Sequence, residues 1–399
     1  MSGPLAFSPE LYYIVLLFAL FVVPRVLQRC RLPAAVTSVM LGAVAGMAIG
    51  LFNGDATIQM LATLGIVSLF LFAGLEVDFA ELRQHKTVLA QHLGLGLIML
   101  FALAYLIHIA LGLEARPAAL AALALLTPST GFILDSLPAL GVTDRERFWV
   151  KSKAIATEIV ALAVLFFALQ STTAASLTVS TLVLIALIAV LPLVFRAFAA
   201  LVVPFAPKSE FAFLLMVAVI AAYFTRKLGV YYLVGAFIVG LTAQRFRERL
   251  PAMASERMLH AVEVFASFFV PFYFFSAGLR LRTEDFGPGS LLAGAGFLAI
   301  MVPLRVAVVA GHRRFALSEP FKAGMRVGAS MLPTLVFTLV IAEILRDRFA
   351  VPHYVFGGLI VYALGTTLIP GFVLRLPVQE IEEPHAPALP NGAAEAGLS

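Results

Sequence analysis

The sequence predicts an all-α membrane protein with about thirteen transmembrane helices. Of the 399 residues, 61% are hydrophobic and only 13% are charged, and the mean hydropathy is +0.99. A water-soluble domain of this size could not expose so much apolar surface without aggregating. The apolar residues also fall into separate runs of about twenty, which is the length that a helix needs to cross a hydrocarbon layer of ~30 Å.

The runs follow one another along most of the chain. Their approximate cores are residues 11–27, 32–51, 58–77, 88–113, 118–140, 150–169, 177–203, 211–223, 230–242, 258–279, 291–309, 327–345 and 354–374. The first run is too long for the core of a signal peptide and no A-x-A-like cleavage site follows it, so we expect a true span. The eighth and ninth runs are short and nearly contiguous, so twelve spans is an alternative count.

The basic residues predict the orientation of these helices. With the N-terminus outside, 20 of the 28 Lys and Arg residues fall on the cytoplasmic side, seven fall outside and Arg305 falls within a span. Because cytoplasmic loops carry an excess of Lys and Arg, we expect an outside N-terminus and a cytoplasmic C-terminus in a cell membrane, such as a bacterial inner membrane. The membrane domain is expected to comprise residues 1–378. Residues 379–399 are acidic and then rich in Pro, Ala and Gly, which predicts a disordered tail.

The charge and the residue spacing argue against other functional classes. The net charge of +5 comes from short gaps between apolar runs, so it indicates membrane topology and not nucleic-acid binding. The one cysteine, Cys30, permits neither an internal disulfide nor a cysteine metal cluster. Because no phosphate loop, nucleophilic triad or metal-ligand spacing is visible, we expect no enzyme activity and no cofactor.

Two short motifs recur at a nearly constant offset. The FLFAGL run of residues 70–75 reappears as FFSAGL at 274–279, an offset of 204, and Pro128 recurs as Pro333, an offset of 205. An odd number of expected spans separates the copies, so the copies would lie in the membrane with opposite orientations, as in inverted-repeat transporters. The predicted units are two repeats and a linker helix, at about residues 9–172, 209–377 and 175–205 respectively.

Prolines interrupt the fifth and the twelfth expected spans. A proline inside a membrane helix frees backbone groups that lipid cannot satisfy, so a polar neighbour is needed. Both spans provide hydroxyl groups there: the candidate residues are Thr127, Pro128, Ser129 and Thr130 in one span and Ser330, Pro333 and Thr334 in the other. Two ordinary kinks are an alternative. The matching repeat positions favour paired interrupted helices whose dipoles point at one site near the midplane.

Ionisable residues deep in spans are a second functional signal. Each costs at least a few kcal/mol in hydrocarbon, and two stand out: Glu158 in the sixth span and Arg305 in the eleventh. A structural ion pair between them is an alternative. A carboxylate in a low-dielectric cavity can exchange a proton for a metal cation, whereas an arginine stays protonated and can only balance charge. Asp135 and Lys151 are lesser candidates for an entry funnel, since positions at a helix end or a membrane face also account for them.

These motifs resemble the monovalent cation:proton antiporter-2 family, which includes Kef-type potassium efflux proteins and bacterial Na⁺/H⁺ antiporters. The resemblance covers residues 11–376. The matching segments are 64–78, similar to the glycine-leucine-acid signature of the third span; 127–130 with 140–142, similar to the first broken helix; 157–159, where members carry an acidic or Gln-Asp pair; 275–279; and Arg305, where members carry Lys or Arg.

The resemblance implies a homodimeric antiporter with crossed discontinuous helices, which exchanges Na⁺ or K⁺ for H⁺ by alternating access. Glu158 and Thr157 would then bind the ion and the proton, and Arg305 would compensate charge. Members normally carry Asp at the position of Glu158, and Thr157 cannot ionise, which favours one titrating carboxylate and electroneutral exchange. A sodium-coupled symporter of an organic anion and a transport-dead membrane sensor or scaffold stay open as alternatives. The choice between Na⁺ and K⁺ depends on cavity dimensions, which the sequence does not give.

Overall fold

The computed structural model describes residues 9–171, 173–206, 209–227, 229, 232–246 and 256–374, and these residues form helices without any β-strand. The α-helices are α1 (Pro9–Gln28), α2 (Ala34–Ala43), α3 (Ala56–Leu75), α4 (Phe79–Gln84), α5 (Lys86–Leu111), α6 (Ala115–Leu126), α7 (Thr130–Ser136), α8 (Asp144–Gln170), α9 (Ala174–Leu201), α10 (Glu210–Lys227), α11 (Tyr232–Arg245), α12 (Glu256–Leu279), α13 (Pro288–Leu317), α14 (Phe321–Ser330), α15 (Leu335–Phe349) and α16 (His353–Val373). A π-helical segment, Val44–Ile49, continues α2. The all-α prediction is confirmed.

The lengths of these helices confirm a protein of many membrane spans. Among the described residues, nine helices are long and apolar enough to cross a membrane, and ten if the bent pair α14 and α15 counts as one span. The apolar segments Ala34–Ile49 and Leu233–Arg245 are shorter. The count of thirteen therefore stays a prediction. The expected tail at 379–399 lies outside the described residues.

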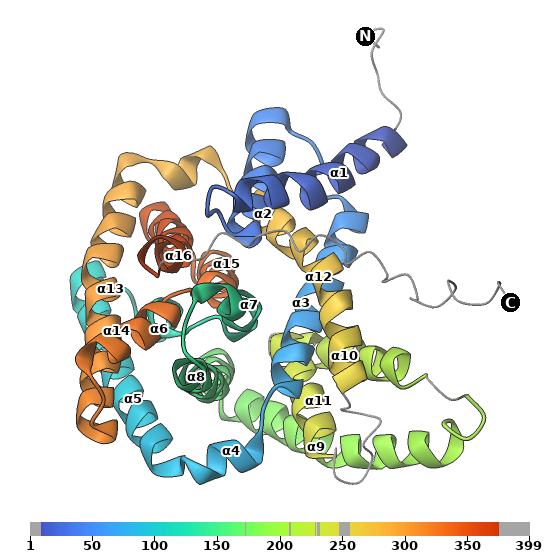
Figure 1. Ribbon diagram of the computed structural model, residues 1–399. Helices are drawn as coiled ribbons and strands as arrows, with labels where there is room; N and C mark the ends of the chain where they lie inside the picture. Colours follow the sequence, from blue (N-terminus) through green and yellow to red (C-terminus); the bar gives the residue numbers. More distant parts are fainter. Residues whose placement is uncertain are drawn as a thin grey trace, which may run out of the picture.

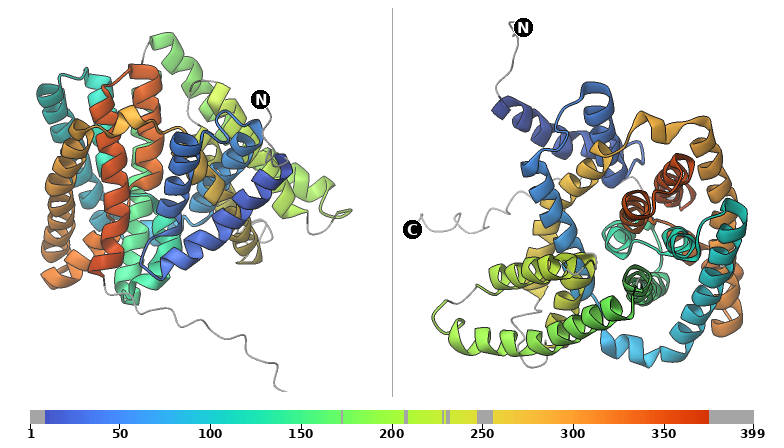
Figure 2. Two further views of the ribbon diagram at one scale, coloured as in Figure 1. Left: turned by 90° about the horizontal axis from the view of Figure 1, so that it is seen from above. Right: turned by 180° about the vertical axis from the view of Figure 1, so that it is seen from behind.

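The helices form two groups that lie side by side (Figures 1 and 2). We call α5–α8 with α13–α16 the core bundle, in which α13 packs along α14 and α16, and α15 packs against α6 and α16. We call α1–α3 with α9–α12 the scaffold bundle, in which α3 packs along α11 and α12, and α2 packs along α12. Contacts of α3 with α7 and of α8 with α9 join the two bundles. The site described below lies at this junction.

Close helix contacts explain the glycine in both copies of the repeated motif. A Cβ atom at Gly74 of α3 would lie 2.4 Å from the backbone oxygen of Phe237 in α11. A Cβ atom at Gly278 of α12 would lie 2.1 Å from the backbone oxygen of Val39 in α2. Small residues let the backbones of two membrane helices come into contact. Van der Waals packing then stabilises the pair, because the hydrophobic effect does not drive helices together within lipid. Each motif therefore brings one helix of the scaffold bundle against another.

Substitution of Gly74 tests this packing. Gly74→Ala is expected to lower the midpoint of thermal unfolding in detergent by several degrees, because overpacking costs typically about 1–3 kcal/mol. Gly94→Ala is the matched control, since no atom lies within 4 Å of a Cβ built on Gly94 in α5. Equal midpoints for the two variants would contradict this assignment.

Candidate ion-binding site

Two interrupted helices cross inside the core bundle. The first breaks between the end of α6 at Leu126 and the start of α7 at Thr130. The second breaks between the end of α14 at Ser330 and the start of α15 at Leu335, where the helix axis bends by 52°. Both breaks contain the prolines that the sequence singled out. In Figure 1, α14 begins beside α13 at the edge of the core bundle, and the chain runs inward from it to α15.

The two breaks satisfy each other's backbone groups. Ser129 donates its backbone N–H to the carbonyl oxygen of Pro333 at 2.8 Å. The Ser129 hydroxyl oxygen accepts the backbone N–H of Val336 at 2.9 Å. Farther along α15, the Thr338 hydroxyl donates to the carbonyl oxygen of Ala124 at 2.8 Å. Since these bonds replace those that the breaks remove, the two prolines mark one shared crossing and not two separate kinks.

Arg305 caps the C-terminal end of α14. Its guanidinium donates to the carbonyl oxygens of Met331 at 2.7 Å and Leu332 at 2.9 Å, and to the Tyr362 hydroxyl at 3.1 Å. Tyr362 in turn donates to the carbonyl oxygen of Leu125, near the end of α6, at 2.7 Å. The C-terminal ends of helices carry partial negative charge and unpaired carbonyls, so a buried cation is stabilised there. Arg305 thus compensates the ends of the interrupted helices.

Glu158 lies in α8 at the junction of the two bundles, with only 2% of its surface exposed. It lines a narrow cavity that has no space for a water molecule. The other lining residues come from α3, the start of α7 and the start of α15: Leu69, Phe70, Ala73, Ser129, Thr130, Gly131, Val336 and Phe337. The carboxyl group therefore faces segments that follow both breaks, and it also faces the scaffold bundle.

The carboxyl group of Glu158 has unused bonding capacity. Thr130 lies against this carboxyl group, but the buried Oε2 atom of Glu158 and the buried Oγ1 atom of Thr130 form no hydrogen bond of normal geometry within the described part of the chain. The ion pairs found among the described residues do not include Glu158. A buried polar atom without a partner is costly, so it is typical of a site that a ligand completes.

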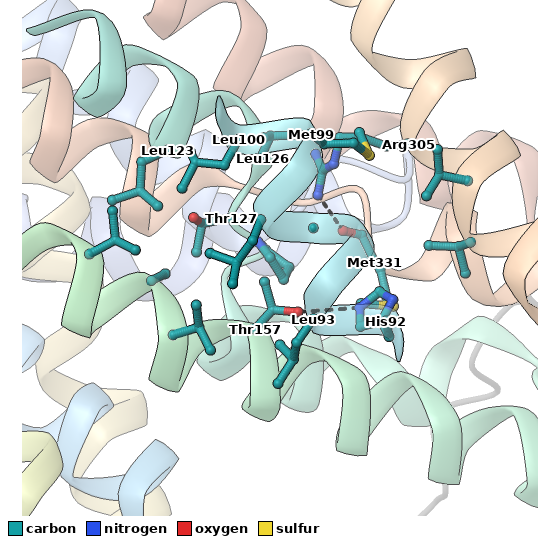
Figure 3. A pocket seen from close by; sticks show the side chains of 18 of the residues that line it. His92, Leu93, Met99, Leu100, Leu123, Leu126, Thr127, Thr157, Arg305 and Met331 are labelled. Carbon is teal, nitrogen blue, oxygen red and sulfur yellow. Dashed lines mark hydrogen bonds between the residues drawn. The ribbon is translucent and has the colours of Figure 1, made fainter. Parts of the chain in front are cut away.

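Thr157 faces a second, larger cavity of about 90 Å³. Its hydroxyl donates to the carbonyl oxygen of Lys153 at 2.8 Å and lies 3.3 Å from Nε2 of His92, as Figure 3 shows for the histidine. Consecutive residues of a helix point about 100° apart, and here Thr157 lines the larger cavity whereas Glu158 lines the narrow one. The structure does not bring these two predicted ligands together.

The remaining predicted residues take different positions around the crossing. Thr127, Pro128 and Arg305 line the larger cavity with Thr157. Arg305 and Glu158 therefore do not meet as an ion pair. The hydroxyl of Ser330 donates to the carbonyl oxygen of Arg326 one turn earlier, at 3.0 Å.

Thr334, the last of the predicted hydroxyl residues, turns toward α16, where its Oγ1 atom lies 3.2 Å from Oγ1 of Thr366. Asp135 belongs to α7, and its side chain is outside the described part of the structure. Of all the predicted hydroxyl residues, Ser129 and Thr130 are therefore the two that share a cavity with Glu158.

Polar contacts join the two bundles at both ends. Lys151 of α8 places its Nζ atom 2.5 Å from Oε2 of Glu76, at the end of α3. At the opposite end of the bundles, Arg280 after α12 pairs with Glu343 of α15 at 3.0 Å. The Glu158 cavity lies between these contacts, so the core and scaffold bundles are bridged on either side of it.

Sequence reasoning missed a buried basic cluster beside the larger cavity. Lys153 is one of the 20 basic residues that the sequence assigns to the cytoplasmic side, yet it is fully buried in α8 and its Nζ atom lies 2.9 Å from Nδ1 of His312. His92 lies next to His312, with ring centroids 5.9 Å apart. These three residues come from three helices and show no sequence pattern, so only the structure brings them together.

Comparisons with known proteins identify a family and several relatives with similar sequences. A family model described as sodium/hydrogen exchanger, transmembrane, matches residues 15–380. The chain is 24% identical over 356 residues to the Na⁺/H⁺-K⁺ antiporter GerN of Bacillus cereus, covering 86% of this chain and 89% of that protein. It is 27% identical over 330 residues to the Na⁺/H⁺ antiporter NhaS5 of Synechocystis, covering 78% of this chain and 44% of that protein.

A solved structure shows the same fold. The sodium proton antiporter MjNhaP1 of Methanocaldococcus jannaschii superposes with a TM-score of 0.66 at 13% identity, covering 92% of this chain and 95% of that one. The similarity thus extends over the core and scaffold bundles and is not limited to the crossing.

The cap on α14 can be tested through stability. Arg305→Leu is expected to lower the thermal unfolding midpoint in detergent, because leaving buried carbonyls unpaired costs about 1–3 kcal/mol each. Arg305→Lys keeps the charge but loses the two-pronged contact, so its midpoint should fall between those of the native protein and the leucine variant. Arg314→Leu, on the same helix but exposed, serves as the control. A native midpoint for Arg305→Leu would refute the capping role.

Proposed function

The chain belongs to the sodium/hydrogen exchanger family, and we propose that it exchanges a monovalent cation for protons across a membrane, with Glu158 as the group that binds either ion. One observation carries the assignment to Glu158: its buried carboxyl group lies at the crossing of both interrupted helices, at the seam between the bundles, with an oxygen atom that forms no hydrogen bond of normal geometry among the described residues. A buried ionisable residue at membrane depth costs several kcal/mol, so such residues are retained mainly where they serve a function.

Competition at one carboxyl group is enough to couple the two fluxes. A protonated carboxyl group is a poor ligand for a cation, and a carboxylate that holds a cation has lost its proton. Each movement of the site across the membrane therefore carries either one cation or one proton. Arg305 keeps its charge throughout because arginine is not deprotonated in proteins, so it carries no proton. This argument gives an electroneutral exchange of one cation for one proton.

The cation would be held by oxygen atoms. Besides the Glu158 carboxylate, the Thr130 hydroxyl lies in the same cavity with unused bonding capacity. Thr157 faces the other cavity and is therefore not part of this shell. The name of the GerN relative includes both Na⁺ and K⁺, and we propose one of these two ions as the substrate.

Alternating access would come from movement of the core bundle against the scaffold bundle. Glu158 lies on the core side of the seam, and the contacts Lys151–Glu76 and Arg280–Glu343 bridge the seam on either side of it. Because its cavity has no space for water, the structure is consistent with a closed intermediate in which both bridges are formed. Opening one end would then require breaking one bridge.

The two halves of the core bundle support the proposed inverted repeat. Each half has a long continuous helix, an interrupted helix and a second continuous helix: α5, α6–α7 and α8 in the first, and α13, α14–α15 and α16 in the second. The scaffold bundle is the proposed dimer surface. We propose a cell-membrane location with the N-terminus outside, on the charge distribution described above.

Glu158 substitutions test the exchange. Glu158→Gln in proteoliposomes should abolish dye-detected proton flux driven by Na⁺ or K⁺, because an amide cannot exchange a proton. Glu158→Asp keeps a carboxylate and should retain flux. Glu263→Gln, at an exposed pair with His260 on α12, should behave like the native protein.

Exchange at the native rate in Glu158→Gln would refute the assignment. Cation binding by native protein without any proton flux would instead indicate a sensor. A sodium-coupled symporter is the less favoured reading, since the Glu158 cavity offers no space for an organic anion.

A further inference from the structure

A compact basic cluster lies in the core bundle beside α8. Lys153 donates toward Nδ1 of His312 at 2.9 Å, and the rings of His312 and His92 lie 5.9 Å apart between their centroids. His92 reaches Thr157 in α8 through its Nε2 atom at 3.3 Å. All three basic side chains are buried, with 0% exposure for Lys153, 8% for His312 and 9% for His92. They come from α8, α13 and α5 respectively.

The charged groups that face this cluster do not neutralise it. Arg313 and Glu319 face Lys153, but they are joined to each other, and Glu319 also pairs with Arg145 at 2.8 Å. Arg313 also faces His312, and the basic groups that face His92 are Lys153 and His312 themselves. Like charges in a low-dielectric interior repel strongly, so three contiguous basic groups without a carboxylate of their own cannot all be protonated.

Unused ring nitrogens show that the cluster is not a saturated structural network. Nδ1 of His92 and Nε2 of His312 are buried and have no hydrogen-bond partner among the described residues. His92 also lines the 90 Å³ cavity with Thr157, so one edge of the cluster borders a space large enough for water. Since Lys153 donates to Nδ1 of His312, the free Nε2 atom of a neutral His312 carries a proton. The Thr157 hydroxyl donates to the carbonyl oxygen of Lys153, so it accepts from Nε2 of His92, and the free Nδ1 atom of His92 is the one that can accept a proton.

We propose that Lys153, His312 and His92 form a proton-binding site separate from Glu158, which holds one exchangeable proton and sets the pH range of exchange. The second half of this proposal rests on the proposed function of Glu158, whereas the proton-binding site itself does not. Lys153 precedes Glu158 by five residues, which is about 7.5 Å along the helix axis. A positive charge at that distance favours the carboxylate of Glu158 and hence cation binding.

Replacement of Lys153 by a neutral residue and by a permanently charged residue should give different outcomes. Lys153→Met removes the positive charge, so Glu158 should take up its proton more readily and the midpoint of the pH–activity profile should move up by about one pH unit. Lys153→Arg keeps a positive charge at every pH, so its midpoint should stay at or below the native value. Lys86→Met, at an exposed position on α5, is the control. Unchanged midpoints in both active Lys153 variants would overturn the role in setting pH range.

Proton counting tests the site without transport. In a Glu158→Gln background, which carries no exchange under the proposed function, the further triple variant Lys153→Met, His92→Gln and His312→Gln should bind about one proton fewer between about pH 9 and about pH 5. Potentiometric difference titration of purified protein in detergent measures this number, and His260→Gln corrects for one exposed histidine.

If the two proteins differ by close to zero or close to two bound protons in that titration, the proposal that the three residues share one exchangeable proton is overturned. If the triple variant fails to fold, the comparison of Lys153→Met with Lys153→Arg in the same background still decides. Arg carries a fixed charge that leaves both histidines neutral, so about one proton fewer should be taken up between about pH 9 and about pH 5, whereas in Lys153→Met the histidines can still take up the proton. Exchange that survives in Glu158→Gln would refute the proposed function and leave the proton count standing, so the two ideas fail separately.

Discussion

The crossing of two interrupted helices is the contact on which the rest of the structure depends. Each break frees backbone groups at membrane depth, where neither lipid nor bulk water can pair with them. Ser129 joins the breaks from one side through its backbone and hydroxyl, and Arg305 pairs with carbonyls at the end of α14 from the other. The irregular backbone is thus stable only because both breaks lie together inside the core bundle.

This arrangement explains the position of Glu158, the carboxylate that we propose as the ion-binding group. α8 runs past the crossing and places Glu158 between the starts of α7 and α15, opposite α3 of the scaffold bundle. Thr157, one residue earlier, points toward α5 and the basic cluster. The helix α8 therefore places the Glu158 carboxyl group in one cavity and the Thr157 hydroxyl, which contacts His92, in the other. A movement of α8 would displace both groups.

The sequence predicted the parts of this site that carry a large energetic cost. Pro128 and Pro333 signalled the crossing because broken membrane helices need partners, and Glu158 signalled the site because a buried carboxylate is expensive. The same logic identified Arg305 but not its partners, since contacts with Met331 and Leu332 depend on how α13 packs on α14.

Other features needed coordinates because no local pattern encodes them. Helix geometry turns the side chains of Thr157 and Glu158 about 100° apart, but the cavity that each residue faces depends on the neighbouring helices. Lys153 looks like a loop charge in the sequence, and its burial depends on α5 and α13 closing over it.

The central claim is that cation and proton compete for Glu158, and calorimetry of the purified protein tests it most directly. Na⁺ or K⁺ is titrated into the native protein in two buffers that differ in protonation enthalpy, so that the heat difference gives the protons released per cation bound. The account predicts close to one proton per cation for the native protein and no cation binding for Glu158→Gln. Cation binding without proton release, or unchanged binding by Glu158→Gln, would contradict it.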